Sequence, residues 1–374
     1  MKTKIFLWAG IMMLGTIMFN ACRKNPGQLC NGGETIVTTT KVFATGLNNP
    51  RGLKFGPDGY LYVAEGGIGG SNSSTTCTQV IPPIGPYLGS TNGSRISRVN
   101  SHGNVSTWVD NLPSCQGNTL DIQGVGDIAF VGNTLYGVLA GAGCSHGVPS
   151  IPNGVFKVNH DRTWKMIANL SEYQMAHPVA NPLPADFEPD GVWYSMESVN
   201  GNLYAIEPNH GELVKITTNG VINRIVDISD KVGHVVPTVQ AFHKGNFYVG
   251  NLGLFPSTGS SVYKITPGGD VSVFATGFTM ILGITFDDLG GLYVLETTTN
   301  NPFPTPGTGD VVRLDPDGSR QVVVTGLNLP TGMTFGPDHK LYISSWGFGM
   351  PPNGSGQILQ VSFKCDRIKG EKNQ

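Results

Sequence analysis

The chain repeats one short pattern of hydrophobic and polar residues six times. Each copy starts with an apolar residue followed by tyrosine and continues as an alternating run, which is typical of a half-buried β-strand. The six tyrosines are Tyr62, Tyr136, Tyr204, Tyr248, Tyr293 and Tyr342. Their last three spacings, taken as differences between these numbers, are 44, 45 and 49 residues and match the ~40–50 residues of a four-stranded propeller blade. The pattern predicts an all-β fold, a six-bladed β-propeller with four antiparallel strands in each blade.

Each copy divides into four expected strands, lettered A to D. Strands A and B, and strands C and D, are separated by short turns rich in Gly, Asn and Asp. The connections from B to C and from D to the next A are much longer, for example residues 66–94, 111–124 and 171–189. In a propeller the two long classes share one face and the two short classes share the other. We therefore expect a long-loop face, where function is usually built, and a plain short-turn face.

The two ends of the repeat indicate how the ring closes. Residues 41–47 have the sequence of a D strand with no A, B or C strand before it. The sixth copy stops after its C strand at residues 356–361. We expect these two segments to pair, so that the N-terminal strand completes the last blade and hides open sheet edges. The predicted propeller covers residues 35–365, with a tail at 366–374.

The N-terminus indicates export. Lysines precede an apolar run at residues 5–19, which is too short to span a bilayer comfortably. A small residue directly before Cys22 resembles the end of a bacterial lipoprotein signal. We therefore expect a signal peptide at 1–21, lipidation of Cys22 and a linker at 22–34; the alternative is ordinary secretion with loss of Cys22. Both alternatives predict an extracytoplasmic protein, in the cell envelope (periplasm or outer membrane) or secreted.

The remaining cysteines suit an oxidising compartment. Cys30 precedes the N-terminal strand and Cys365 follows the last strand, so a bridge between them would join the closing blade covalently. Cys77, Cys115 and Cys144 are all expected in connections on one face. One pair and one free thiol should result, with the pairing left open. The sequence contains no Cys-x-x-Cys spacing that would indicate a metal site.

Composition narrows the possible partners. Charged residues make up 13% of the chain, against a typical ~25%, and the net charge is −2. Neither a nucleic acid nor an acidic membrane surface is favoured as a partner. Membrane contact is expected only through the N-terminal lipid, and the protein is expected to be a monomer.

A first ring of residues should lie where the A strands begin at the channel mouth. Counting back from each tyrosine gives Arg51, Gly126, Tyr194, Thr238, Leu282 and Thr331. Propeller lactonases hold a divalent cation near such positions with oxygen ligands, preferably anionic ones. This ring contains no carboxylate, which argues against a metal-dependent lactonase. A register slip that brought in Asp127 or Asp190 would reverse that conclusion.

A second ring lies three residues beyond each tyrosine. It consists of Glu65, Leu139, Glu207, Asn251, Glu296 and Ser345. Its three glutamates could bind a divalent cation such as calcium or act as acid and base. Alternatively, each could accept backbone N–H bonds from a neighbouring loop, and repetition in several blades favours this structural role. No cofactor is otherwise expected.

Other candidates lie on the long-loop connections. His210 and His234 are the histidines placed there, while Trp346 and the pair Trp193-Tyr194 end near the channel. The aromatic side chains could stack on a sugar or planar ligand, or simply cover the core. No nucleophile elbow, zinc-protease motif or Walker loop is present, so no catalytic residue is assigned. The candidate binding residues at the channel mouth are Arg51, Glu65, Tyr194, Glu207, His234, Asn251, Glu296 and Trp346.

Several segments resemble one known family. Pro-Arg-Gly-Leu at 50–53 and Leu-Tyr-Val-Ala-Glu-Gly-Gly at 61–67 resemble the first blade of the ScyD/ScyE family, as do residues 300–308 and the Pro-Thr-Gly at 330–332. The resemblance covers essentially the whole mature chain and implies an exported, NHL-like six-bladed propeller. It implies no catalytic residue. The chain departs from the family in its long Cys77 loop and in its second blade.

We interpret the sequence as that of a cell-envelope binding module rather than an enzyme. Its partner would be a small molecule, a glycan or an envelope protein, bound at the long-loop face. The alternative is a propeller hydrolase of lactonase or esterase type with a site at the channel mouth. A purely structural surface protein is a third, weaker reading.

Overall fold

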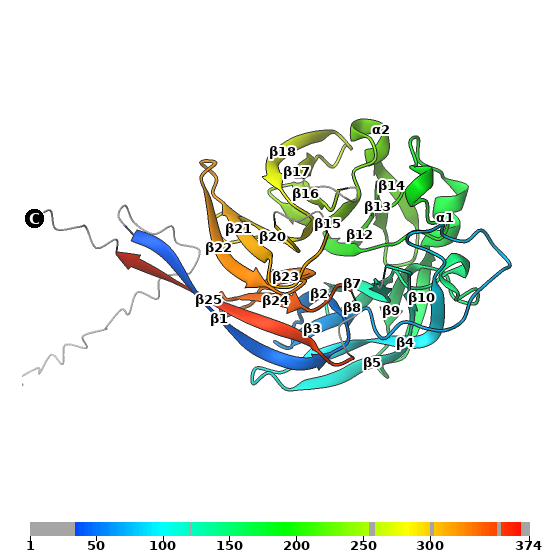
Figure 1. Ribbon diagram of the computed structural model, residues 1–374, viewed down its shortest axis with the longest axis horizontal. Coiled ribbons are helices and arrows are strands. Elements are labelled where there is room, and N and C mark those ends of the chain that lie inside the picture. Colours follow the sequence, from blue (N-terminus) through cyan, green and yellow to red (C-terminus); the bar gives the residue numbers. More distant parts are fainter. Residues whose placement is uncertain (1–33, 120, 254–258, 300–302, 350–352, 368–374) are drawn as a thin grey trace, which may run out of the picture.

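A computed structural model describes residues 34–119, 121–253, 259–299, 303–349 and 353–367. These residues form six antiparallel β-sheets arranged around a common centre (Figure 1). Five sheets have four strands, and the sheet of blade 1 gains a short fifth strand. The predicted all-β, six-bladed propeller is therefore confirmed.

Blades 1 to 3 follow one another along the chain. Blade 1 contains β2 (Pro50–Phe55), β3 (Leu61–Glu65), β4 (Leu88–Val99), β5 (Val105–Gln116) and β6 (Ile122–Gln123). Blade 2 contains β7 (Val125–Val131), β8 (Thr134–Leu139), β9 (Gly154–Val158) and β10 (Trp164–Asn169). Blade 3 contains β11 (Ser195–Val199), β12 (Asn202–Glu207), β13 (Glu212–Ile216) and β14 (Ile222–Asp227).

Blades 4 to 6 complete the ring. Blade 4 contains β15 (Pro237–His243), β16 (Asn246–Asn251), β17 (Ser260–Ile265) and β18 (Val271–Phe278). Blade 5 contains β19 (Ile281–Phe286), β20 (Leu292–Glu296), β21 (Gly309–Leu314) and β22 (Arg320–Leu327). Blade 6 contains β23 (Gly332–Phe335), β24 (Leu341–Ser345), β25 (Gly356–Arg367) and the N-terminal β1 (Glu34–Leu47).

Short helices occupy only the connections. They are α1 (Leu170–Ala176), α2 (Ile228–Val232) and the 3-10 turns η1 (Cys144–His146) and η2 (Pro184–Asp186). Within the described part of the chain, every helix is too short to cross a membrane.

The closing blade is built as expected from the sequence. Strand β1 runs antiparallel to β25, with Lys41 opposite Gln360 and Leu47 opposite Gly356. Pairing continues well past the predicted residues, because the two strands remain in register out to Glu34. The extra length forms a two-stranded ribbon that projects from the ring at the left of Figure 1.

Blade 1 differs from the prediction at its long-loop end. Strands β4 and β5 continue beyond the blade as a hairpin, with Leu88 opposite Gln116, and β6 pairs onto β5. Parts of the expected connections 66–94 and 111–124 are therefore strand. Cys115 lies in β5, not in a loop, because it packs with Val80 and Tyr87 in a small core beneath the loop.

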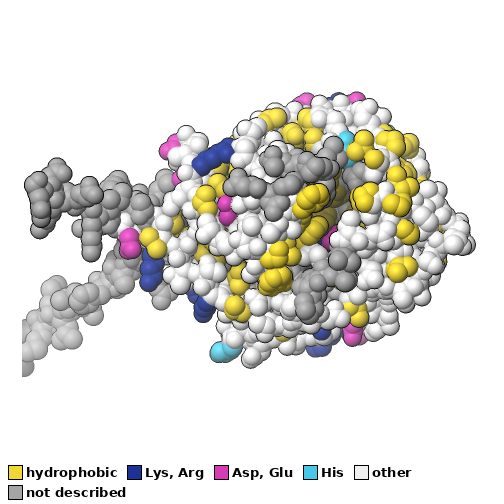
Figure 2. Space-filling view, viewed as in Figure 1, with side chains coloured by type: hydrophobic (Ala, Val, Ile, Leu, Met, Phe, Trp, Pro, Cys, Tyr) yellow, Lys and Arg dark blue, Asp and Glu magenta, His cyan; other side chains and the backbone are white. Residues whose placement is uncertain are grey.

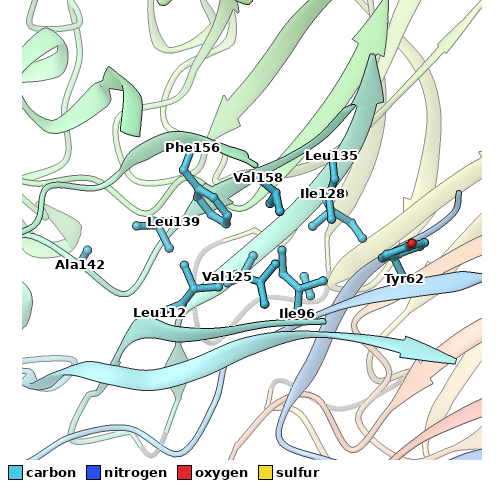
Figure 3. Packing of buried hydrophobic residues seen from close by; sticks show 12 residues of the cluster. Tyr62, Ile96, Leu112, Val125, Ile128, Leu135, Leu139, Ala142, Phe156 and Val158 are labelled. Atoms are coloured by element: carbon cyan, nitrogen blue, oxygen red, sulfur yellow. The ribbon is translucent and has the colours of Figure 1, made fainter. Parts of the chain in front are cut away.

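The hydrophobic core lies between the blades. Six clusters of buried side chains each combine residues from two neighbouring sheets. Figure 3 shows the cluster between blades 1 and 2, where Leu112 and Ile96 face Val125 and Leu139. Because each blade buries its faces only against its neighbours, the ring is the folding unit.

The repeated tyrosine has a defined place in these interfaces. In four of them, the phenylalanine that ends an A strand packs edge-to-face on the tyrosine of the preceding blade. The pairs, with their ring-centroid distances, are Phe55–Tyr342 (5.0 Å), Phe130–Tyr62 (5.1 Å), Phe286–Tyr248 (4.9 Å) and Phe335–Tyr293 (5.0 Å). Such aromatic pairs contribute more than their buried area alone. The sequence repeat is therefore an interface repeat.

Candidate functional site

The six A strands enclose a narrow central cavity of about 30 Å³. Of the first predicted ring, Gly126, Tyr194, Leu282 and Thr331 line this cavity. Its volume suits roughly one water molecule, so a larger ligand would have to bind at the mouth. Figure 2 shows one face of the ring, with hydrophobic side chains gathered around its centre.

Arg51 lies at the long-loop end of this cavity and is 2% exposed. Its guanidinium donates to the Tyr194 hydroxyl at 2.8 Å and to Asp121 Oδ1 at 2.7 Å. Burial alone would lower the pKa of Arg51, but Tyr194 and Asp121 outweigh it and raise the pKa. The guanidinium of Arg51, in blade 1, thus contacts both blade 3 and the link that precedes blade 2.

A second charged group lies deeper in the channel. Lys54 Nζ is 3.0 Å from Glu197 Oε2. Burial would lower the pKa of Lys54, but the charges of Glu197 and Asp127 outweigh it and raise the pKa. Asp127 also lines the cavity, and burial raises its pKa to about 6 although Lys54 opposes this. Asp127 Oδ2 accepts the backbone N–H of Met196 at 2.9 Å.

Asp127 lines the cavity beside Gly126, the residue that the sequence placed there. A β-bulge lies between Val125 and Asp127, and β2, β15 and β19 are irregular at the same place. The channel therefore contains a carboxylate that the predicted ring left out. Even so, across the described residues no group of three or more His, Cys, Asp or Glu side chains is placed to hold a metal ion.

Except for Leu139 in blade 2, the second predicted ring ties the B strands to the links before their own blades. Glu65 accepts the N–H of Asn48 at 2.6 Å, Glu207 accepts that of Val192 at 2.8 Å, and Glu296 accepts that of Thr279. The three glutamates are at most 5% exposed. The expected backbone hydrogen bonds are confirmed, and we call these contacts link staples.

Two other members of the ring make equivalent staples with donor and acceptor reversed. Asn251 Nδ2 donates to the carbonyl of Val235 at 2.7 Å, and Ser345 Oγ donates to that of Asn328 at 3.0 Å. The links beside these staples carry non-glycine residues with positive φ, including Val236 at 54°. This conformation is costly for a β-branched residue, so the staples support a strained backbone.

The electrostatic surroundings of the stapling glutamates differ. Glu65 is paired with Arg95 at 2.8 Å. In blade 5, Glu296 faces Asp310 across β20 and β21. Burial and the neighbouring Asp310 raise the pKa of Glu296 to about 8, and burial raises that of Asp310 to about 6. Near neutral pH this pair therefore holds a proton.

A buried polar cluster, of which sequence reasoning named only His210, lies beneath the loops of blades 1 to 3. Glu188, in the connection 171–189, is 2% exposed; its Oε2 is 2.9 Å from His146 Nε2 and its Oε1 accepts from the Tyr87 hydroxyl at 3.2 Å. His210 Nε2 lies 3.0 Å from the Glu188 carbonyl oxygen. None of these residues recurs in other blades, so no pattern marked them.

The remaining sequence candidates fall into different environments. Asp190 accepts the N–H and hydroxyl of Ser145 and so holds the turn η1. Trp193 is fully buried in the cluster between blades 2 and 3, which makes it a core residue. His234 is partly buried between α2 and β15, and Trp346 is partly buried directly after β24.

The cysteines cross-link the long-loop face. Cys77 and Cys144 form a disulfide that joins the loop of blade 1 to that of blade 2. Cys115 is a free, buried thiol whose pKa is raised by burial. Cys365 is disulfide-bonded, but its predicted partner Cys30 lies outside the described residues. Cys22 and the predicted signal peptide at 1–21 lie outside them as well. The Cys77–Cys144 bond is consistent with an extracytoplasmic compartment.

Comparison with known proteins supports the fold. No protein-family model matches the chain, and no curated protein matches it in sequence. Among solved structures it is similar to an auxiliary nutrient binding protein from Bacteroides thetaiotaomicron, at 10% identity and a TM-score of 0.53 over 88% of this chain and 77% of that one.

Two propeller enzymes are similar to the chain as well. A gluconolactonase from Xanthomonas campestris is 10% identical, with a TM-score of 0.52 over 87% of this chain and 90% of that one. A PQQ-bound aldose sugar dehydrogenase from Streptomyces coelicolor is 13% identical, with a TM-score of 0.54 over 87% and 98%. At such identities these likenesses establish the fold and no activity.

Proposed function

We propose that this protein is an exported, lipid-anchored binding module of the bacterial cell envelope, of the ScyD/ScyE type, that binds its partner through the long-loop face. The observation that carries this proposal is the Cys77–Cys144 disulfide, which joins the long loop of blade 1 to the loop of blade 2. Glu188 fixes the connection 171–189 to the same loops. A surface ordered in advance loses less entropy when it binds a partner.

Binding is favoured over hydrolysis because the glutamates of the second ring already accept backbone hydrogen bonds. A general base must reach the proton that it removes from a substrate. Glu65, Glu207 and Glu296 are instead buried and engaged by backbone N–H groups. A lactonase or esterase using the same channel mouth remains the alternative function.

The partner belongs to one of three classes: a small molecule, a glycan or an envelope protein. Of the predicted aromatic residues, Trp346 is the most accessible, since Tyr194 is 9% and Trp193 0% exposed. A partly exposed tryptophan beside polar loops suits stacking on a sugar ring. Soluble envelope glycans are therefore the first ligands to test.

The test is a thermal-shift titration of the chain from residue 23 with soluble peptidoglycan fragments and oligosaccharides, with and without calcium. A ligand present at 100 times its Kd should stabilise the fold by about 2.7 kcal/mol. Trp346→Ala should weaken this effect, whereas Trp164→Ala, on the outer strand β10, should not.

Turnover of lactones and p-nitrophenyl esters is measured in parallel. Saturable binding without turnover supports the module. Turnover that depends on a divalent cation, and that is lost in one glutamate variant but kept in another, would replace the binding function by the hydrolase. Palmitate labelling that disappears in Cys22→Ala tests the anchor.

A further inference from the structure

We propose a second binding site, on the short-turn face, for a compact aromatic molecule that carries a positive charge. The site is a cavity of about 520 Å³ where the A–B turns of blades 5, 6 and 1 meet. Its volume lies within the range of pockets that hold small organic ligands. It lies at the opposite end of the ring from the long loops and shares no residue with the candidates there.

The walls of this short-turn pocket are three phenylalanines, Phe55, Phe286 and Phe335, one from the end of each A strand. Each ring is partly buried and is held edge-to-face by the tyrosine of the preceding blade, at interplanar angles of 72°, 67° and 85°. Because these interface contacts fix the rings, the aromatic walls are present before any ligand arrives.

Two of the three turns are small and alike. Blades 1 and 6 contribute Gly-Pro turns, Gly56-Pro57 and Gly336-Pro337. A Cβ on Gly336 would lie 2.7 Å from the Tyr342 ring and 3.0 Å from the Phe55 ring, so glycine is what lets this turn pack against the aromatic pair. At the same two positions blade 5 has Asp287 and Asp288, which makes the pocket asymmetric.

The two carboxylates have different surroundings. Asp287 is buried, accepts the N–H of Gly291 at 2.8 Å, and has Oδ2 3.3 Å from Arg313. Its charge is therefore balanced from behind the pocket. The Asp288 side chain is 70% exposed at the rim, with Oδ2 3.4 Å from Nδ1 of His339 on the turn of blade 6.

The described lining residues include no lysine or arginine. An exposed carboxylate at the rim of aromatic walls, with His339 as its neighbour, favours a ligand with a cationic group and a flat apolar body. The cation is attracted by Asp288 and by the phenylalanine ring faces that line the space, while one face of Phe286 is covered by His243 at 4.1 Å. A neutral ligand would use only the walls, and an anion would be repelled by the rim.

Three indoles with the same ring separate these contributions. Tryptamine is cationic, indole is neutral and indole-3-propionate is anionic. Binding to the purified chain, measured by calorimetry, should be about tenfold tighter for tryptamine than for indole and weakest for the propionate. Asp288→Asn should remove the preference for tryptamine and leave the affinity for indole unchanged. Asp230→Asn, an equal loss of charge at an exposed site in α2, should keep the preference.

Hydrogen exchange locates the bound molecule. Saturating tryptamine should slow exchange in the turns at 55–60, 286–291 and 335–340 and leave the loop around Cys77 unchanged. Equal affinities for the three indoles, an unaltered preference in Asp288→Asn, or protection confined to the long loops would each overturn the site. Glycan binding to the long-loop face should be the same in Asp288→Asn and in the natural chain, so the two proposals stand or fall separately.

Discussion

The ammonium group of Lys54 in blade 1 lies 3.0 Å from the carboxylate of Glu197 in blade 3, and these blades are not neighbours in the ring. The Arg51–Tyr194 hydrogen bond makes a second connection between the same two blades. Both interactions lie along the central channel beside β7 of blade 2. The channel is thus partly filled by side chains that brace one side of the propeller.

Removing the cation of this brace should destabilise the fold. Lys54→Met leaves Glu197 and Asp127 without their positive neighbour. Because the pair is partly exposed, we expect a loss in the free energy of unfolding between that of an exposed and that of a buried pair, about 1–3 kcal/mol. Adding Glu197→Gln should recover part of the loss, which a double-mutant cycle from denaturant melts would show. Lys231→Met, at an exposed ion pair, should change nothing measurable. Strict additivity of the two channel substitutions would mean that the ion pair does not couple them.

The link staples should matter for stability whether or not metal is present. Glu65→Ala, Glu207→Ala and Glu296→Ala each leave a backbone N–H without its acceptor, so each should cost about 1–3 kcal/mol. The measurement is thermal unfolding of the three variants with and without calcium. Glu296→Gln retains an acceptor oxygen for Thr279 and can donate to Asp310, so it serves as the matched control. A loss that appears in one blade and only in the presence of calcium would contradict the structural role.

Stability should fall as pH rises from about 4.5 to 8. The pKa of Glu296 is raised to about 8 and that of Glu212 to about 7, both by burial first, so the folded state holds their protons more tightly than the unfolded state does. Their contribution is complete below the unfolded pKa and is lost as pH passes the folded value. Denaturant melts between pH 5 and 8.5 should show this slope.

The matched variants identify the groups responsible. Asp310→Asn removes the carboxylate that opposes ionisation of Glu296, so the pH dependence above pH 6 should become shallower. Asp288→Asn, an exposed change on the short-turn face, should keep the original slope. A slope that is the same in all three proteins would exclude this pair as its source.

The disulfide of the long-loop face should contribute to stability because it closes a long loop. Cys77 and Cys144 are separated by 67 residues, for which removal of a bridge costs about 2–4 kcal/mol. The double substitution to alanine should lower the unfolding midpoint and weaken glycan binding.

The buried Cys115 should resist alkylation until the protein unfolds. Rapid labelling of Cys115 in the native protein would contradict its placement in β5.

The second bridge is a matter for peptide mapping without reduction. We expect a peptide containing Cys365 to be recovered joined to one containing Cys30. Recovery of Cys365 joined to Cys22 would instead mean that Cys22 is not lipidated.

What the sequence predicted correctly rests on repetition. Tyr293 and Tyr342 recur at one position because four of the six blade interfaces use the same aromatic contact, and the pairing of Lys41 with Gln360 follows from a missing fourth strand. Asp127 was left out of the predicted ring because the count took one residue from each A strand, whereas neighbouring residues of each strand line the cavity. Glu188 and His146 were missed because their contact joins two irregular loops, where no periodicity constrains the partners.

The short-turn pocket illustrates another limit. The turns at Gly56 and Gly336 carry ordinary turn residues, and nothing in their local sequence distinguishes a turn that ends a hairpin from one that also lines a cavity. Of the three turns, that of blade 5 differs in sequence, because it has Asp287-Asp288 where blades 1 and 6 have Gly-Pro. This difference gains a meaning only from the structure, in which Phe55, Phe286 and Phe335 line one cavity.

The pairing of β1 with β25 also determines when the protein can finish folding. Strand β1 finds its partner only after the strands of the other five blades have been made, because Lys41 pairs with Gln360. Contacts this distant along the chain form slowly, and an unpaired edge strand can associate with other chains. Residues 34–47 therefore have no strand partner until residues 356–367 have been made. A chain that terminates before residue 356 loses its last strand and leaves its first strand without a partner.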